Sequence, residues 1–169
     1  PPRPGGCVEL SIQQYGQSVL LDPSHSSADK VVTSKMMRQA TAWLMSTFPQ
    51  DNEDRTFRLW GLHAAGLSSD ALKTYRDDLL QTQLQNGGFA QREGMSADAY
   101  ATGQALATLA MTGYPVEETS FKRGIRFLLD TQDKSGAWIV ITRSRPVQTF
   151  FDNGDPGDKS QFISFVATS

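Results

Sequence analysis

The stretch Gln83-Leu84-Gln85-Asn86-Gly87-Gly88-Phe89 decides the fold, because its pattern occurs again as Gln132-Asp133-Lys134-Ser135-Gly136-Ala137-Trp138. Each copy has a glutamine, three residues, a glycine, one residue and an aromatic ring. A glutamine at a helix end can bond the exposed backbone groups of an adjoining helix terminus, and glycine permits a tight turn after it. The ring can then cover these hydrogen bonds. The chain is therefore expected to contain repeated units.

The repetition continues beyond these two loops. The sequence Tyr100-Ala101-Thr102-Gly103 is echoed by Val166-Ala167-Thr168-Ser169. The offset from Ala101 to Ala167 is longer than the offset from Gln83 to Gln132. We therefore expect an insertion in the second connecting loop.

The spacing of apolar residues predicts helices on both sides of these loops. Ser96 is the expected N-cap of the fourth helix, and Phe121, Ile125, Leu128 and Leu129 are the expected buried stripe of the fifth. No comparable strand pattern interrupts the series. We therefore predict an all-α fold of antiparallel α/α hairpins, with helices at about 34–47, 54–66, 70–82, 97–112 and 116–131 and a sixth beginning near Ser160.

The N-terminal segment over 1–33 differs from the rest of the chain. Residues 1–6 have linker composition, which indicates a piece of a longer protein. Val8, Leu10 and Ile12 alternate with polar residues, as in a short N-terminal β-hairpin, and residues 22–33 have the composition of a loop. We thus predict an irregular segment over 1–33 and a repeat domain over 34–169.

The repeated loops resemble the Gln-x-x-x-Gly-x-Trp signature of the squalene-hopene and oxidosqualene cyclase superfamily. Trp138 matches the signature fully, and Phe89 replaces its tryptophan. The resemblance implies an α/α toroid, in which helices 54–66, 97–112 and the one near Ser160 are inner and helices 70–82 and 116–131 are outer. It also implies that six motif residues are structural clamps: Gln83, Gly87, Phe89, Gln132, Gly136 and Trp138.

A closed toroid needs more hairpins than this chain supplies. Either the remainder of the parent protein or a second copy is therefore expected to complete the ring, since an open arc of repeats leaves apolar edges that need neighbours.

Several relatives with similar architecture use motifs that are absent here. The Asp-x-Asp-Asp acid of alkene-protonating cyclases has no counterpart, and Asp77-Asp78 has the character of solvated charge. Protein prenyltransferases use an Asp, Cys and His zinc set, whereas the single cysteine, Cys7, lies in the irregular segment. A complement thioester motif would require glutamine where Leu10 follows Glu9.

Aromatic residues on the inner helices are candidates for lining an isoprenoid cavity, because a ring face stabilises positive charge. His63 could act there as a base, although a packed or surface histidine is the simpler reading. Packing in the core equally explains the rings. The candidate cavity-lining residues are Trp60, His63, Tyr100, Phe162 and Phe165.

The insertion carries Asp152, Asp155 and Asp158, whose oxygens could hold calcium, although the spacing departs from an EF-hand. An ordinary turn-rich surface loop is the simpler interpretation. Arg143 and Arg145 could pair with these aspartates or meet a phosphorylated ligand.

Composition excludes several classes of partner. With 16 basic and 18 acidic residues among 169, the net charge of −2 argues against nucleic-acid binding. The longest apolar run is too short for a transmembrane helix, no secretory leader is visible, and no cofactor is expected. Two functions follow: a terpene-cyclase-like domain that binds or cyclises an isoprenoid, or a non-catalytic repeat module for protein–protein interaction.

Overall fold

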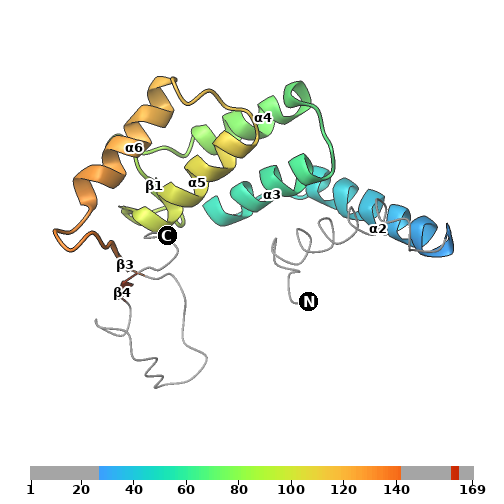
Figure 1. Ribbon diagram of the computed structural model, residues 1–169, viewed down its shortest axis with the longest axis horizontal. Helices are drawn as coiled ribbons and strands as arrows, with labels where there is room; N and C mark the ends of the chain where they lie inside the picture. Colours follow the sequence, from blue (N-terminus) through green and yellow to red (C-terminus); the bar gives the residue numbers. More distant parts are fainter. Residues whose placement is uncertain (1–26, 142–160, 164–169) are drawn as a thin grey trace, which may run out of the picture.

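The computed structural model describes residues 27–141 and 161–163, and their arrangement confirms the all-α class (Figure 1). Four very short strands accompany the helices, although the sequence showed no strand pattern there. The elements are α2 (Ser27–Ser46), α3 (Asn52–Ala64), α4 (Ser69–Leu80), β1 (Phe89–Ala90), β2 (Ala97–Asp98), α5 (Ala99–Met111), α6 (Thr119–Thr131), β3 (Ile139–Ile141) and β4 (Gln161–Ile163).

Helix α3 lies at the centre, where it packs against α2, α4 and α5, and α5 packs in turn against α6. Gly124 allows α6 to approach α5 closely, because a Cβ added to this glycine would lie only 2.8 Å from Leu106 Cδ2 of α5. The core formed by these helices contains Leu44, Leu59, Leu62, Leu72, Leu79, Phe89, Ala101, Ala105 and Leu109.

The prediction of a loop over 22–33 is wrong for residues 27–33, because α2 begins at Ser27. This segment contains neither glycine nor proline, and Asp29 in the first turn is favourable at the positive end of the helix dipole. The expected N-terminal hairpin, Cys7 and Glu9 lie outside the described residues.

The fourth helix begins later than predicted. Its N-cap is Asp98 rather than Ser96, since Asp98 Oδ1 accepts a 2.9 Å hydrogen bond from Ala101 N. Residues 97–98 instead form β2, which pairs with β1.

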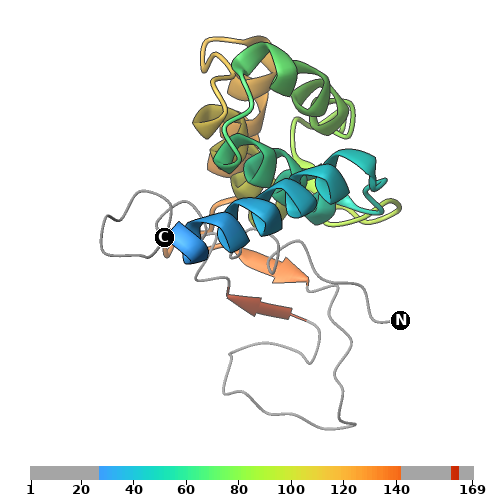
Figure 2. The ribbon, with the colours of Figure 1, turned by 90° about the vertical axis from the view of Figure 1, so that its right-hand side faces the viewer.

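The predicted helix near Ser160 is wrong at residues 161–163, which form β4 paired antiparallel with β3 (Figure 2). Strand pairing satisfies the backbone groups of Ile139–Ile141, which a helix could not do.

The two small hairpins have the same register within the repeat. Ala90 pairs with Ala97, and Ile139 pairs with Ile163. Ile139 lies as far after Ala90 as Gln132 lies after Gln83. Ile163 likewise lies as far after Ala97 as Ala167 lies after Ala101. The small hairpin therefore belongs to the repeated unit.

The predicted buried stripe of α6 is partly wrong. Phe127 is buried, whereas Ile125 is 41% and Leu129 is 62% exposed. Within the described part of the chain, α6 is the last helix of the row and has a neighbour on one side only.

Candidate functional site

The loop that follows α4 is held by the amide of Gln83. Gln83 Nε2 donates to Gly87 O and to Ser120 O in the first turn of α6, both at 2.8 Å. Leu84 N donates to Gly88 O and Gly87 N to Leu84 O, each at 2.9 Å. Gly87 adopts a φ of +89°, which glycine tolerates without a steric penalty. One side chain therefore closes its own loop and joins that loop to α6.

The loop that follows α6 has the same internal hydrogen bonds. Gln132 Nε2 donates to Gly136 O at 2.8 Å. Asp133 N donates to Ala137 O at 2.9 Å, and Gly136 N donates to Asp133 O at 2.8 Å. The φ of Gly136 is +88°. The two sequence copies are therefore two copies of one backbone structure.

The two aromatic residues have different surroundings. Phe89 is completely buried, and its backbone N donates to Thr102 Oγ1 of α5 at 2.9 Å. Trp138 is half-buried, and its indole Nε1 donates to Leu128 O at 2.9 Å. The first residue thus anchors its loop to α5, whereas the second lies against α6, the helix that precedes it.

The candidate cavity residues fall in different places. Trp60 is half-buried and stacks on Phe57, with ring centroids 6.1 Å apart. Tyr100 OH donates to Glu53 Oε1 at 3.0 Å and thereby joins the N-terminal turns of α5 and α3. His63 is exposed at the opposite end of α3.

The other two candidates do not lie on a described helix. Phe162 lies in β4, which corrects its predicted position, and Phe165 lies outside the described residues. Phe57 was not among the candidate cavity residues, although its spacing of three residues from Trp60 predicts that the two share one face of the helix.

Asp98 is a partly buried carboxyl that sequence reasoning also missed. Burial raises the pKa of Asp98 above its ordinary value, although hydrogen bonds from Ala101 N, from the Gln91 side chain and from Tyr100 N oppose the shift. Gln91 Nε2 donates to Asp98 Oδ2 at 2.7 Å and to Ile141 O at 2.9 Å. Asp98 thus lies where the first turn of α5, β1 and β3 meet. Its position as an aspartate near the start of a predicted helix is the one sequence feature that could have drawn attention to it.

Replacing Asp98 with asparagine is expected to remove one pH-dependent contribution to stability. Because the folded-state pKa lies above the reference value of 3.8, protonation favours the folded chain, and this contribution disappears as pH rises through the folded-state pKa. The difference between the unfolding free energies of wild type and Asp98→Asn, wild type minus variant, should therefore fall as pH is raised from below 3.8 through the folded-state pKa. Denaturant titrations at several pH values measure this difference.

Asp133→Asn provides a control of opposite sign. The Ser135 backbone N–H lowers the pKa of Asp133, so its contribution is present at neutral pH and is lost as pH falls through the folded-state pKa. Equal slopes for the two variants would contradict the opposite pKa shifts of Asp98 and Asp133.

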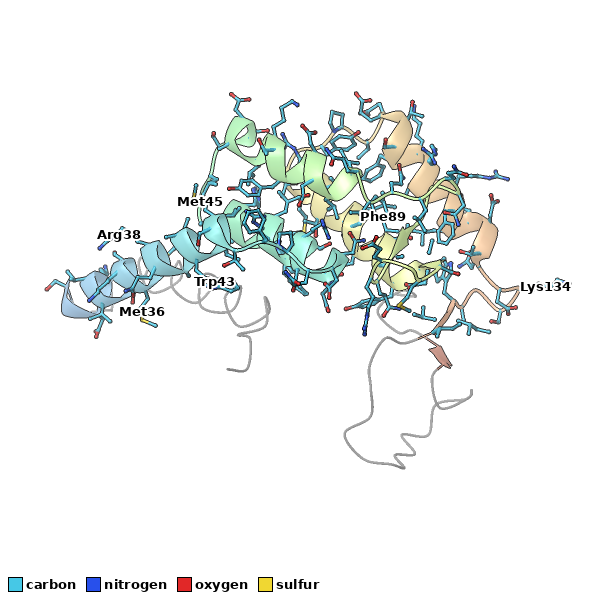
Figure 3. All side chains as sticks on the ribbon, turned by 180° about the vertical axis from the view of Figure 1, so that it is seen from behind. Met36, Arg38, Trp43, Met45, Phe89 and Lys134 are labelled. Carbon is cyan, nitrogen blue, oxygen red and sulfur yellow. The ribbon has the colours of Figure 1, made fainter. Side chains whose placement is uncertain are left out.

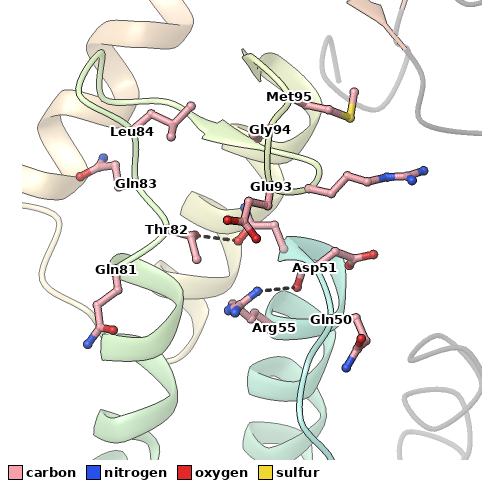
Figure 4. A pocket seen from close by; sticks show the side chains of 13 residues that line it. Gln50, Asp51, Arg55, Gln81, Thr82, Gln83, Leu84, Glu93, Gly94 and Met95 are labelled. Carbon is pink, nitrogen blue, oxygen red and sulfur yellow. Dashed lines mark hydrogen bonds between the residues drawn. The ribbon is translucent and has the colours of Figure 1, made fainter.

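A separate pocket of about 370 Å³ opens at the N-terminal end of α3 (Figure 4). Thr82 Oγ1 donates to Asn52 Oδ1 at 2.8 Å across its wall, and Arg55 Nη1 donates to Asp51 O at 3.1 Å. Asp51 and Glu93 place carboxylates in the lining, and Arg55 and Arg92 place cations there. Trp60, His63 and Tyr100 are not among its lining residues, so this polar pocket is not the predicted hydrocarbon cavity.

The acidic loop cannot be placed in this site, because Asp152, Asp155 and Asp158 lie outside the described residues, as do Arg143 and Arg145. Within residues 27–141 and 161–163, no group of three His, Cys, Asp or Glu side chains could hold a metal ion. No helix in that same part of the chain is long and apolar enough to span a bilayer.

Comparison with known proteins connects these repeats to the cyclases. No family model matches the chain. The chain is similar to lanosterol synthase from Candida albicans, with 37% identity over 95 residues. The match covers 48% of this chain and 13% of the relative, so it spans only a small part of that protein's length. This similarity supports the resemblance to the cyclase superfamily that the Gln-Gly-aromatic loops indicated.

Proposed function

We propose that the chain is an arc of a terpene-cyclase-like toroid and that α3 and α5 form part of the wall of its isoprenoid-binding cavity. The similarity to lanosterol synthase carries this proposal. The repeated loops support it, because the first of them joins α4 to α6 as successive outer helices, while α3 and α5 pack against each other as the inner pair.

The half-buried rings supply the chemistry that such a wall needs. Phe57 and Trp60 stack on one side of α3, and Tyr100 lies at the start of α5. Aromatic faces bind hydrocarbon by apolar burial, and they also stabilise positive charge that develops on a substrate. A wall of this kind suits a polyene that passes through cationic intermediates.

Asp98 helps to hold the start of α5 in this wall. Its Oδ1 accepts from Ala101 N at 2.9 Å, and its Oδ2 accepts from Gln91 Nε2 at 2.7 Å.

Incubation of the full-length protein with squalene and oxidosqualene in detergent micelles tests this proposal. Binding is followed by a competition assay with a fluorescent polyene, and products by gas chromatography and mass spectrometry. Trp60→Ala should weaken binding about tenfold, because a large apolar contact is lost.

Phe48→Ala is the matched control, because the Phe48 side chain is 83% exposed in the segment between α2 and α3. This variant should bind and react as wild type does. The proposal would be wrong if the wild-type protein neither bound nor converted squalene or oxidosqualene.

Exposed apolar side chains on α2 favour a second function, a non-catalytic repeat module for protein–protein interaction. Val31 is 69% exposed, Val32 is 58% exposed and Met45 is 51% exposed, and Figure 3 shows Met36 directed away from the helical core. Substituting these α2 residues with serine should abolish association with a partner and leave hydrocarbon binding intact. Hydrocarbon binding without any partner would instead favour the cyclase-like domain.

A further inference from the structure

The polar pocket at the N-terminal end of α3 is built from three separate segments of the chain (Figure 4). They are the turn into α3, the segment that follows α4, and β1 with the loop that leads to β2. The volume of about 370 Å³ lies within the range of small-molecule sites. The polar groups of the lining therefore decide which molecule would fit.

Asn52 is a buried residue of this lining, and one of its polar atoms has no partner. The residue is only 5% exposed, and its Oδ1 accepts from Thr82 Oγ1 at 2.8 Å. Its Nδ2 has no hydrogen-bond partner within the part of the chain that the structure describes. A buried donor without a partner costs free energy, which a ligand that accepts from it recovers. The pocket therefore calls for an acceptor beside Asn52.

Arg55 brings a positive charge to the same place. It follows Asn52 by three residues, so the two side chains lie on one face of α3. The guanidinium is held in position, because Nη1 donates to Asp51 O at 3.1 Å and Nε lies 3.5 Å from Asp78 Oδ2. A carboxylate suits this pair, since one of its oxygens can accept from Asn52 Nδ2 and the other from the guanidinium.

Glu93 brings a negative charge to the lining from a different segment (Figure 4). Its side chain is exposed. The charged lining residues are two acids and two bases, so their charges cancel: Asp51, Glu93, Arg55 and Arg92. A ligand with only one sign of charge would meet a like charge in this pocket, whereas a zwitterion meets a partner for each of its charges.

The lining also has an apolar part, formed by Leu84, Ala90 and Met95. Leu84 is 38% exposed, so an aliphatic group placed against it would remove apolar surface from water. The pocket therefore combines a site for a carboxylate, a site for a cation and a site for a short hydrocarbon chain.

We propose that this pocket binds a free α-amino acid with an aliphatic side chain. The carboxylate accepts from Asn52 Nδ2 and from Arg55, the ammonium group lies against Glu93, and the side chain covers Leu84. The site is separate from the proposed isoprenoid-binding wall, because neither Trp60 nor Tyr100 lines it.

Three matched probes test this assignment on the full-length protein by isothermal titration calorimetry. L-leucine carries both charges, isocaproate has the same carbon skeleton without the ammonium group, and isoamylamine has it without the carboxylate. L-leucine should bind about threefold more tightly than isocaproate, which is the scale of an exposed ion pair. It should bind at least about tenfold more tightly than isoamylamine, which loses the charge-assisted hydrogen bonds.

Asn52→Asp replaces the unpaired donor with a carboxylate oxygen of the same shape. Aspartate still accepts from Thr82 Oγ1 and is favourable in the first turn of a helix, so the fold should be retained, which circular dichroism checks. The affinities for L-leucine and isocaproate should each fall about tenfold or more, because two carboxylates would meet. The affinity for isoamylamine should not fall.

Glu93→Gln removes the second charge at an exposed position and therefore remains informative if Asn52→Asp fails to fold. It should lower the affinity for L-leucine to that for isocaproate and should not lower the affinity for isocaproate. Glu117→Gln is the matched control, because Glu117 is exposed between α5 and α6 and does not line the pocket. This control should bind all three probes as wild type does.

Any of four results would overturn the proposal. L-leucine could fail to bind, isocaproate could bind as tightly as L-leucine, Asn52→Asp could bind L-leucine as wild type does, or Glu93→Gln could do so. The probes are not isoprenoids, so failure here is distinct from failure of the proposed cyclase-like function.

Discussion

Replacing Gly87 with alanine is expected to destabilise the folded chain by about 2–5 kcal/mol, as the sum of two separate costs. The left-handed conformation at a φ of +89° costs a residue with a Cβ about 1–2 kcal/mol. The new Cβ would also lie 2.6 Å from Arg123 O, which is a backbone atom that cannot rotate away. Forcing α6 to move adds about 1–3 kcal/mol. Chemical denaturation measures the sum.

Gly136→Ala separates the two costs. Its φ of +88° is nearly the same, but no backbone atom lies within 4 Å of an added Cβ. We expect this variant to lose only the conformational part, about 1–2 kcal/mol. Equal losses for the two glycines would show that α6 is not seated against the first loop as described.

Phe89→Ala is expected to cost about 3–5 kcal/mol, the usual cost of removing a buried aromatic side chain. Phe89 is completely buried, and its backbone N is bonded to Thr102 Oγ1 of α5 at 2.9 Å. Because small domains are stable by only about 5–15 kcal/mol, this loss removes much of the total. Thermal and denaturant unfolding, followed by circular dichroism, measure it.

Trp138→Ala is the comparison within the same motif. Trp138 is half-buried, so its truncation should cost less than that of Phe89, although a larger side chain is removed. Phe89→Leu keeps most of the apolar volume and remains measurable if Phe89→Ala fails to fold. A greater loss at Trp138 than at Phe89 would contradict the packing described here.

Much of the helical framework follows from local patterns. The apolar spacing predicted α3, α4 and α6 close to their observed positions, and Gly66 and Gly113 end their helices with φ values of +85° and +83°. The position of α2 was harder to predict, because residues 27–33 are mostly polar and their helical preference is weak.

The strands were missed because they are very short. Residues 161–163 have an ambiguous pattern, and pairing with Ile139–Ile141 decides their conformation. A segment as short as one turn of helix carries too little periodicity to distinguish a strand from that turn.

The candidate site was only partly accessible from the sequence. Trp60 and Tyr100 were named from residue type. The stacking of Phe57 on Trp60 is local to α3, whereas the hydrogen bond from Tyr100 to Glu53 depends on how α3 and α5 are placed. Asp98 has no distinctive motif around it. Its raised pKa arises from burial beside β1 and β3, which no sequence pattern reports.

By itself, the sequence determined the repeated unit: the two glutamine loops, the glycines with positive φ and the two repeat offsets that the strand register reproduces. These are local matters, since a glycine and a nearby amide define a turn without help from distant residues. Only the tertiary structure decided that Gln83 reaches α6, that Phe89 is buried and that Leu129 is exposed. Identical loops differ in this way because burial depends on which helix lies alongside, and the neighbour is supplied by packing rather than by the loop's own residues.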